Sequence, residues 1–195
     1  MKTLIIYAHP NKEGNNGLIL KNVKNFLKNT NYEILDLYSM KYKPILEDKE
    51  LYTQGKKHKS KTTKKLQDKI SESDKIIVIY PVWWNNMPAI LKGFFEKIIT
   101  PGFAFKYKKY FGWLPVPVGL LKDKKAVVFL TTNSPKWIYW TLQGRRASKT
   151  IKNDLLGFCG VKTKVYHLGH AVHPENNKEK ITNMVRKGLK QLMKK

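Results

Sequence analysis

Five short apolar runs, rich in β-branched residues, alternate along the chain with segments of helical periodicity. The clearest run is Ile76–Tyr80, which is apolar throughout, as expected of a strand in a parallel sheet that is buried on both faces. Comparable runs predict four further strands, at Lys2–Ala8, Tyr32–Leu37, Ala126–Thr131 and Val161–Leu168.

Between these runs, apolar residues recur at the spacing of one helix face. In the segment after Ile76–Tyr80, Asn85 or Asn86 can cap a helix, and Pro88 lies where proline is tolerated near a helix start. The apolar residues of this helix fall at i, i+3, i+4, i+7, i+8, i+11 and i+12: Met87, Ile90, Leu91, Phe94, Phe95, Ile98 and Ile99. The same periodicity predicts helices over Leu18–Leu27, Ser60–Ser71, Arg146–Leu156 and Ile181–Leu192, with a short helix at Leu46–Leu51 inside an otherwise irregular stretch.

Strands that alternate with helices over the full length predict an α/β fold with a parallel sheet and helices on both faces. Five strands fit the flavodoxin-like order 2-1-3-4-5, and we expect residues 1–195 to form one domain. In that order the loops after Ala8, Tyr80 and Leu130 converge at the carboxyl edge of the sheet, where open α/β sheets bind ligands.

The three loops carry two kinds of chemistry. Gly14, Asn15, Asn16 and Gly17 stand at the start of a predicted helix, where their backbone N–H groups would present an anion site, although the loop lacks both standard phosphate-binding glycine patterns. Trp83 and Trp84 favour a planar apolar ligand, and they are equally consistent with core or interface anchors. A phosphate site beside aromatic loops predicts a receptacle for FMN.

The segment Lys108–Lys122 is long, aromatic and apolar, and it contains Trp113. We predict a loop that serves as a binding loop or an interface.

The chain carries 38 Lys and Arg against 14 Asp and Glu, a formal net charge of +24. The basic residues are dispersed, with a local concentration at Lys56–Lys65, and no nucleic-acid-binding motif accompanies them. This pattern predicts a solvated basic surface, no specific nucleic-acid partner and weak association with anionic surfaces.

Cysteine usage and the N-terminus indicate a cytoplasmic protein. The single cysteine, Cys159, excludes an intramolecular disulfide and is interpreted as a small buried residue. The first apolar run is too short for a signal peptide. His167, His170 and His173 are spaced by three residues, but without carboxylates beside them we predict no metal site.

Several motifs together resemble the NAD(P)H:quinone oxidoreductase family of the flavodoxin-like fold. They are Tyr7-Ala8-His9-Pro10, Asn16-Gly17 at a helix start, Pro81-Val82-Trp83-Trp84, Met87-Pro88-Ala89-Ile90-Leu91-Lys92-Gly93 and Gly102-Phe103-Ala104-Phe105. The resemblance covers most of the chain, and the combination is far more specific than any single piece.

The resemblance implies a homodimer with a flavin site at each subunit interface. It assigns the phosphate and ribityl contacts to His9, Asn15, Asn16 and Gly17, the isoalloxazine contacts to Pro81, Val82, Trp83, Trp84 and Asn85, and the polar ring edge to Thr131, Thr132 and Asn133. It places Phe105, Tyr107 and Trp137 at the acceptor pocket, with Tyr139 and Arg145 as the catalytic pair.

The chain departs from the family pattern at three of these places. Gly14 stands where a serine is common in the phosphate loop, and Asn133-Ser134 stands where the family has two glycines. Arg145 stands in place of the histidine that follows the family tyrosine, which removes a Tyr/His proton relay. The chain ends soon after its last helix, which favours FMN over FAD.

The sequence therefore predicts an FMN-dependent enzyme that transfers hydride from NADPH or NADH to quinones, or to nitro or azo compounds that fit the same aromatic slot. An alternative is a flavin-bearing ancillary subunit of a membrane system such as potassium efflux. A one-electron carrier like flavodoxin is disfavoured, because such carriers are usually acidic whereas this chain is strongly basic.

Overall fold

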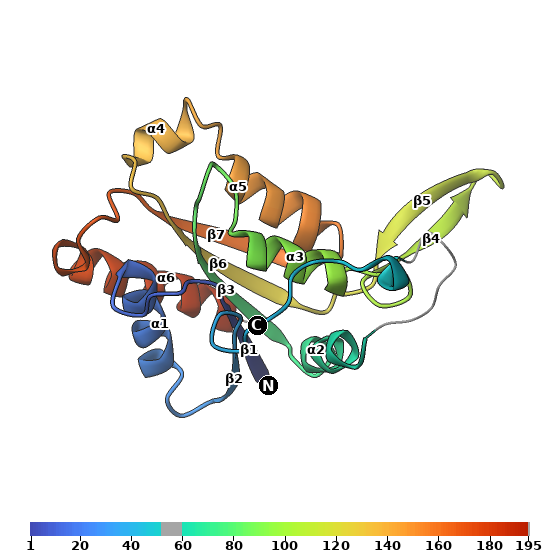
Figure 1. The fold of residues 1–195 in the computed structure, drawn as a ribbon, viewed down its shortest axis with the longest axis horizontal. Coiled ribbons are helices and arrows are strands. Elements are labelled where there is room, and N and C mark those ends of the chain that lie inside the picture. Colours follow the sequence, from blue (N-terminus) through green and yellow to red (C-terminus); the bar gives the residue numbers. More distant parts are fainter. Residues whose placement is uncertain (52–59, 195) are drawn as a thin grey trace.

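The structure, a computed structural model, describes residues 1–51 and 60–194, and its centre is a five-stranded parallel sheet (Figure 1). The strand order is β2-β1-β3-β6-β7. Their bounds are Lys2–Tyr7 (β1), Asn31–Asp36 (β2), Lys75–Pro81 (β3), Lys125–Thr131 (β6) and Lys162–Leu168 (β7). This is the predicted order 2-1-3-4-5, because the two additional strands, β4 and β5, lie outside the sheet.

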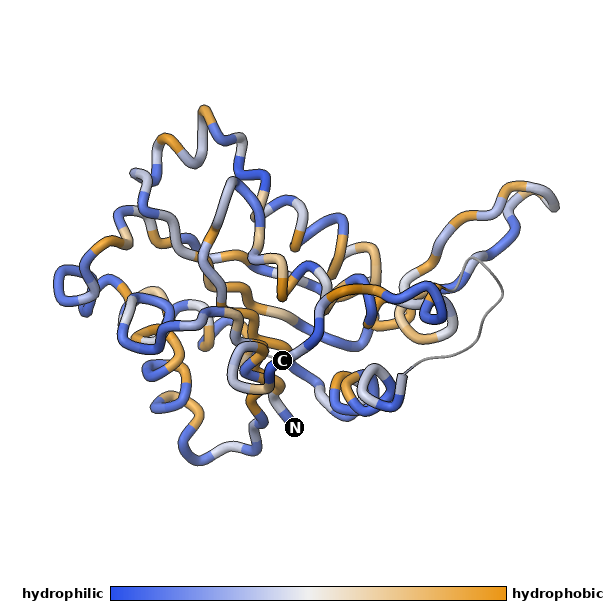
Figure 2. Tube along the Cα trace, in the orientation of Figure 1, coloured by the Kyte–Doolittle hydropathy of each residue, from blue (hydrophilic) through white to orange (hydrophobic). Residues whose placement is uncertain are grey.

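Helices cover both faces of the sheet because its central strands are apolar on both sides. Ile77 and Ile79 of β3 pack with α1 (Asn15–Phe26) and α6 (Lys178–Met193). Ile76, Val78 and Tyr80 pack with α2 (Lys61–Ser71), α3 (Ala89–Ile98) and the helical stretch that follows residue 145. The hydropathy colouring places the most apolar positions along these strands and on the inner sides of the helices (Figure 2).

Two helices differ from their predicted form. The helix α3 begins at Ala89 with Pro88 as its N-cap and no side-chain cap bond, so neither Asn85 nor Asn86 caps it. The predicted helix Arg146–Leu156 is one α-helical turn, α5 (Arg146–Lys149), followed by π-helix over Thr150–Gly157. In a π-helix each backbone hydrogen bond spans five residues instead of four, and over one or two turns the apolar side chains still lie on one face. Apolar periodicity alone therefore does not distinguish a π-helix from an α-helix.

The prediction of a loop over Lys108–Lys122 was wrong. Residues Phe105–Tyr110 (β4) and Leu114–Gly119 (β5) form an antiparallel hairpin that projects from the body of the protein (Figure 1). Pro115 and Pro117 are compatible with it because each strand of a two-stranded ribbon is an edge strand.

The remaining short elements lie in connections. They are a 3₁₀ turn at Asp48–Glu50, inside the predicted helix Leu46–Leu51, the helix α4 (Lys136–Trp140) and a 3₁₀ turn at Pro174–Asn177. Residues 56–59 of the basic concentration Lys56–Lys65 lie outside the described residues. Cys159 is buried as predicted, and burial raises the pKa of its thiol to about 12.

Candidate functional site at the carboxyl edge of the sheet

The loops after β1, β3 and β6 meet at the carboxyl edge of the sheet, and hydrogen bonds tie them together. Asn16, in the first turn of α1, donates through Nδ2 to Thr131 Oγ1 at 2.9 Å. The Val82 amide, just after β3, donates to the Thr131 carbonyl at 2.8 Å. Because β1, β3 and β6 are neighbours in the sheet, three segments distant in sequence form one continuous rim.

The rim presents the N-terminus of α1. Its N-cap, Gly14, has extended backbone and provides no side-chain acceptor for the first-turn N–H groups. Asn15, Asn16 and Gly17 are buried there, and Asn15 Oδ1 accepts a hydrogen bond from Asn177 Nδ2 at 3.2 Å. The helix start therefore offers backbone N–H donors to an anion. The buried side-chain amides of Asn16 and Asn177 hold this turn in place through hydrogen bonds to Thr131 and Asn15.

The loop after β3 is a tight turn that exposes two tryptophans. Trp83 and Asn86 exchange two backbone hydrogen bonds, and the residues between them, Trp84 and Asn85, have φ of 50° and 59°. Trp84 is fully exposed, and the Trp83 ring lies 5.9 Å from the His9 ring. These indoles lie over the carboxyl edge and are not anchors of this chain's own core.

A tyrosine and a histidine meet beneath the same edge. The Tyr139 ring lies 4.2 Å from the His167 ring, and His167 Nε2 lies 2.8 Å from Thr132 Oγ1. Burial lowers the pKa of His167 to about 4, with a contribution from the positive charge of Lys136. This imidazole is therefore neutral at physiological pH.

Burial also raises the pKa of Tyr139, despite opposing hydrogen bonds from Ser148. The Tyr139 hydroxyl lies 2.6 Å from Ser148 Oγ and accepts a hydrogen bond from the Ser148 amide at 2.9 Å. Tyr139 thus keeps its proton at neutral pH.

Three buried polar atoms at this edge lack a hydrogen-bond partner among the described residues. They are Asn16 Oδ1 in α1, Asn85 Oδ1 in the turn after β3 and His167 Nδ1 in β7, and a fourth such atom in the described chain is Tyr42 Oη. Buried polar groups of native proteins are nearly always satisfied, so a polar ligand or an ordered water is expected at these atoms.

Not every predicted site residue lies on this rim. The Arg145 guanidinium lies over the Trp140 ring at 4.7 Å, and the Tyr139 hydroxyl is bonded to Ser148 instead. Trp137 is exposed on α4. Phe105 is buried at the base of the hairpin against Phe158, with ring centroids 4.9 Å apart, and Tyr107 is exposed beyond it. Within one chain, Phe105 and Tyr107 belong to the hairpin and not to the rim.

Sequence reasoning missed His167, Ser148 and Gln143 as site residues. Gln143 accepts a hydrogen bond from Asn85 Nδ2 at 3.0 Å through its carbonyl, which ties the tryptophan turn to the segment before α5. His167 was considered only as a metal ligand. Its position near the carboxyl end of a predicted strand could have identified it as a site residue. In the structure it pairs with Leu130 of β6. Among the described residues, no group of three or more His, Cys, Asp and Glu is arranged to hold a metal ion.

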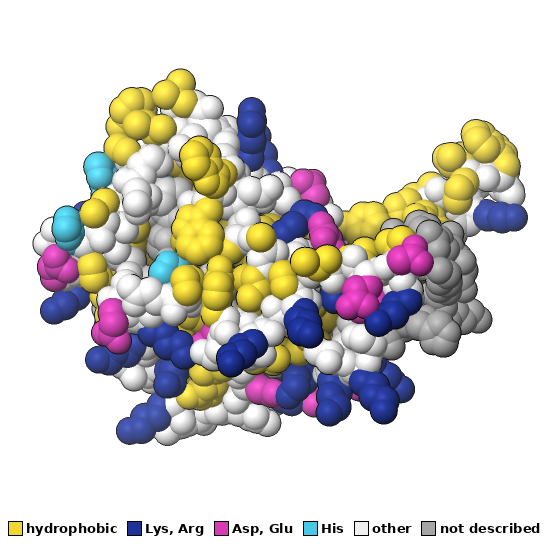
Figure 3. Space-filling view, in the orientation of Figure 1, with side chains coloured by type: hydrophobic (Ala, Val, Ile, Leu, Met, Phe, Trp, Pro, Cys, Tyr) yellow, Lys and Arg dark blue, Asp and Glu magenta, His cyan; other side chains and the backbone are white. Residues whose placement is uncertain are grey.

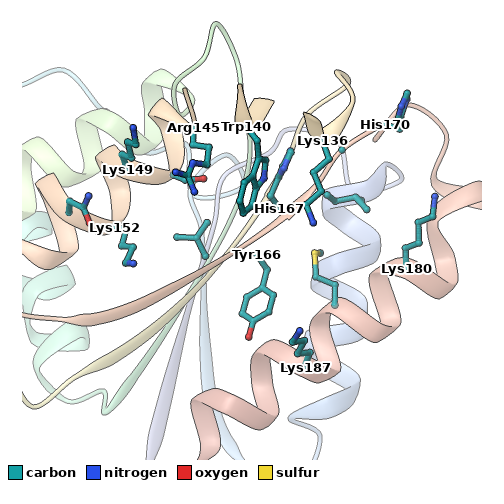
Figure 4. Close-up of a pocket in the computed structure, with 16 residues that line it drawn as sticks. Lys136, Trp140, Arg145, Lys149, Lys152, Tyr166, His167, His170, Lys180 and Lys187 are labelled. Atoms are coloured by element: carbon teal, nitrogen blue, oxygen red, sulfur yellow. The ribbon is translucent and has the colours of Figure 1, made fainter. Parts of the chain in front are cut away.

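A basic groove of about 800 Å³ continues from His167 along the free edge of β7, between the α4–α5 region and α6 (Figure 4). Lysine and arginine side chains from both sides surround it, and no Asp or Glu is among the residues that line it. The cations are Lys136, Arg145, Lys149, Lys152, Lys180 and Lys187. The region beside the rim is therefore strongly attractive to anions.

No helix within the described residues is both long and apolar enough to cross a membrane.

Residues 1–192 match a protein family described as having a flavodoxin-like fold. The chain is 30% identical to an uncharacterized NAD(P)H oxidoreductase of Haemophilus influenzae, over 89% of this chain and 85% of that protein. It is 29% identical to NAD(P)H dehydrogenase [quinone] 1 of Cavia porcellus, over 87% of this chain and 70% of that protein.

Among solved structures, Smu.1420 from Streptococcus mutans superimposes with a TM-score of 0.84 at 30% identity, covering 96% of this chain and 98% of that one. The fold, the rim at the carboxyl edge and these relatives together show that the chain belongs to the NAD(P)H:quinone oxidoreductase family of flavodoxin-like proteins.

Proposed function

We propose that this protein binds FMN at the carboxyl-edge rim and uses NADPH or NADH to reduce quinones or similar aromatic acceptors. The observation that carries the proposal is the set of three unsatisfied buried polar atoms, Asn16 Oδ1, Asn85 Oδ1 and His167 Nδ1, around an exposed aromatic turn. A relative from Coprothermobacter proteolyticus, 34% identical over 47% of this chain, is named an FMN-dependent NADH:quinone oxidoreductase, which supports the choice of flavin.

Each part of FMN would contact a different segment of the rim. The first turn of α1, with Asn15, Asn16 and Gly17, would supply backbone donors for the phosphate, and His9 lies near the start of the preceding loop. The turn Pro81–Asn85 would lie against the apolar ring system. Thr131, Thr132 and Asn133 would meet its polar edge. When bound, FMN supplies the hydride chemistry, and the protein supplies binding, orientation and the surrounding charges.

His167 and Tyr139, which would lie near the isoalloxazine ring, do not change protonation state near neutral pH. Neutral His167 has Nε2 against Thr132, and the nitrogen on the other side, Nδ1, has no partner in the described chain. Tyr139 stays protonated and is held by Ser148. The Tyr139 and His167 rings are in contact, so these two groups form a polar floor that does not change charge between pH 5 and pH 8.

Acceptor binding is proposed to need two subunits. Tyr107 is exposed on the hairpin, away from its own rim, and its side chain would line the acceptor pocket of a second copy. Phe105 is buried behind it, with ring centroids 5.6 Å apart, and would support Tyr107 there. Trp137 on α4 is exposed beside the rim and would form another wall.

The first test is the absorption spectrum of the purified protein after addition of FMN under argon. We expect a bound-flavin spectrum that bleaches with NADPH or NADH and returns when a quinone such as menadione is added. Failure of the apoprotein to bind FMN overturns the cofactor assignment. A bound flavin that NADPH and NADH leave oxidised overturns the reductase assignment alone.

A further inference from the structure

The basic groove beside β7 is surrounded by cations from two separate parts of the chain. Lys149 and Lys152 come from the helical stretch after residue 145, and Lys180 and Lys187 come from α6 (Figure 4). All four side chains are exposed. A negatively charged ligand in the groove would therefore be attracted from both sides.

None of the six groove cations forms an ion pair with an Asp or Glu of the described chain. Elsewhere lysines do find acidic partners: Lys2 pairs with Glu72 and Lys12 pairs with Asp36, each at 2.8 Å. The space-filling view shows Asp and Glu side chains among the basic ones on the lower part of the face that it draws (Figure 3). Like charges gathered on one concave surface repel one another, so a bound anion would stabilise the groove.

Apolar and aromatic side chains also line the groove. Val165, Tyr166 and Leu168 come from β7, and Met184 comes from α6. Trp140, which is 50% exposed, lines it from the end of α4. Inorganic phosphate would need only the cations, whereas an organic ring also packs against these side chains. The volume of about 800 Å³ is large enough for such a ligand.

Trp140 lies where the aromatic lining meets the positive charge. The Arg145 guanidinium lies 4.7 Å from the centroid of its ring, and Lys136 Nζ lies 5.6 Å from it. A base packed beside Trp140 would therefore have cations next to it. One molecule that carries both a flat base and phosphate groups would satisfy both the aromatic lining and the lysines.

We propose that the groove binds a nucleotide with several phosphate groups, its base against Trp140 and its phosphates between the lysines of α6 and those of the helical stretch after residue 145. Two sources share this chemistry. One is the adenosine end of NADPH, which fits because the groove meets the candidate flavin site at His167, and this source rests on the proposed function. The other is a separate nucleotide such as ATP, which requires no reductase activity.

The test is isothermal titration calorimetry of the purified protein, with FMN added, at about 0.05 M NaCl, where charges are weakly screened. The probes are ATP, adenosine 2′,5′-bisphosphate and inorganic tripolyphosphate. We expect at least one nucleotide to bind more tightly than tripolyphosphate, because packing of the base adds to the attraction of the charges. The absence of saturable binding by both nucleotides overturns the proposal.

Nucleotide binding requires neither reduction of the flavin nor turnover, so the two proposals fail separately. A protein without reductase activity that binds ATP overturns the proposed function and leaves the groove site in place. An active reductase that binds neither nucleotide overturns the groove site alone.

A pair of lysine variants locates the phosphates. Lys152→Gln with Lys187→Gln removes one cation from each side of the groove and is expected to weaken nucleotide binding about fivefold or more. The matched control is Lys21→Gln with Lys24→Gln, which removes the same charge from exposed positions on α1 and should change affinity less than about twofold. Equal losses in the two variants would mean that net charge alone binds the nucleotide, and the groove site fails.

Trp140→Leu tests the position of the base. We expect it to weaken nucleotide binding about fivefold and to leave the affinity for tripolyphosphate unchanged, because only the nucleotides have a base to pack. If tripolyphosphate binds as tightly as the nucleotides and Trp140→Leu affects none of the three, the groove is a simple anion site and the nucleotide assignment is wrong. Far-ultraviolet circular dichroism of each variant checks that the fold is retained.

Reductase kinetics distinguish the two sources. If the groove holds the adenosine end of NADPH, adenosine 2′,5′-bisphosphate competes with NADPH, and the Lys152/Lys187 variant raises KM for NADPH more than KM for NADH. If ATP binds in the groove and leaves KM for NADPH unchanged, the ligand is a separate nucleotide. A single-stranded RNA that the Lys152/Lys187 variant no longer binds, and that ATP does not displace from the native protein, assigns the groove to nucleic acid and overturns the proposal.

Discussion

Gly17 is the residue at which the backbone of the candidate phosphate site has least clearance. A Cβ added there would lie 1.7 Å from the Lys12 carbonyl oxygen, so the loop after β1 crosses the first turn of α1 without space for a methyl group. We expect Gly17→Ala to displace this loop, lower stability by about 2 kcal/mol and weaken FMN binding at least roughly tenfold. Flavin fluorescence titration and urea unfolding measure the two effects.

Gly14 provides the matched control for Gly17. It lies three residues earlier, at φ −84°, and a Cβ there would meet nothing within 4 Å. Gly14→Ala is expected to retain FMN affinity within about twofold, because an N-cap without a side-chain bond loses little on this change. Equal losses in both variants would show that local clearance does not shape the site.

The second residue-scale prediction concerns His167 and acid. Its pKa is about 4 in the folded protein and about 6.5 in an unfolded chain, so the unfolded state takes up the proton first as pH falls. Above about pH 6.5 the imidazole is neutral in both states, and the protein keeps its full stability. Between about pH 6.5 and pH 4 only the unfolded state binds the proton, so the free energy of unfolding decreases as pH falls. After allowance for solvent screening, the loss is about 2 kcal/mol.

His167→Gln, which keeps a polar group near Thr132 but does not titrate, is expected to remove this part of the pH dependence. The measurement is the free energy of unfolding of both proteins at pH 7 and pH 4.5. The native protein should lose more than the variant over that interval. Identical losses would mean that His167 is accessible to protons in the folded state.

At this scale periodicity places Thr131 at the end of a buried strand and Asn16 at the start of a helix. The hydrogen bond between their side chains follows from the neighbouring positions of these elements at the carboxyl edge of the sheet. Tyr139 was assigned through family resemblance. Its contact with His167 depends on how far α4 lies from the end of β7, a long-range distance that no local pattern encodes.

At the scale of elements, the tryptophan turn after β3 is connected to the segment before α5 by one side chain. Asn85 sits at φ 59° and donates to the Gln143 carbonyl at 3.0 Å. Asparagine suits both demands, since it tolerates left-handed backbone and carries an amide donor. The two contributions can be separated by substitution.

Asn85→Gly keeps the left-handed backbone accessible but removes the hydrogen bond, with an expected loss of about 1 kcal/mol. Asn85→Ala removes the bond and adds backbone strain, for an expected loss of about 2 kcal/mol. Urea unfolding of the two variants measures the difference. A glycine variant less stable than the alanine variant would show that the turn does not retain its left-handed backbone.

The elements that the sequence predicted well are those buried on one or both sides. Each of the five strands lies within one or two residues of its predicted bounds, because a buried strand is marked by an apolar run. The hairpin was missed because Pro115 and Pro117 argue against a strand, and because most of its residues are exposed, so no buried apolar run marks it. The π-helical stretch was predicted as α-helix because the two share an apolar stripe.

At the scale of the whole molecule, the excess positive charge is distributed unevenly relative to the sheet. Acidic residues at the amino-terminal ends of strands neutralise nearby lysines there: Lys2 pairs with Glu72 at 2.8 Å, and the Lys2 amide donates to Asp74. The basic groove beside β7 has no acidic residue among those that line it. Anions are therefore drawn toward this groove.

This field leads to a prediction about the two nicotinamide cofactors. NADPH carries one phosphate group more than NADH, roughly two additional negative charges at neutral pH. Electrostatic steering by a protein of net charge +24 acts more strongly on the more highly charged ligand, and salt screens it within about 10 Å at 0.1 M. We expect kcat/KM for NADPH to fall severalfold more steeply between 0.02 and 0.3 M NaCl than kcat/KM for NADH.

The groove lysines determine whether this effect is local. Lys180→Gln with Lys187→Gln removes two charges beside β7, and Lys21→Gln with Lys24→Gln removes two from α1, so the pairs match in net charge. Coulomb interactions over short distances are screened least, so the groove pair should flatten the salt dependence for NADPH much more than the α1 pair. Equal flattening by both pairs would mean that the total charge steers the reductant and that the groove contributes nothing of its own.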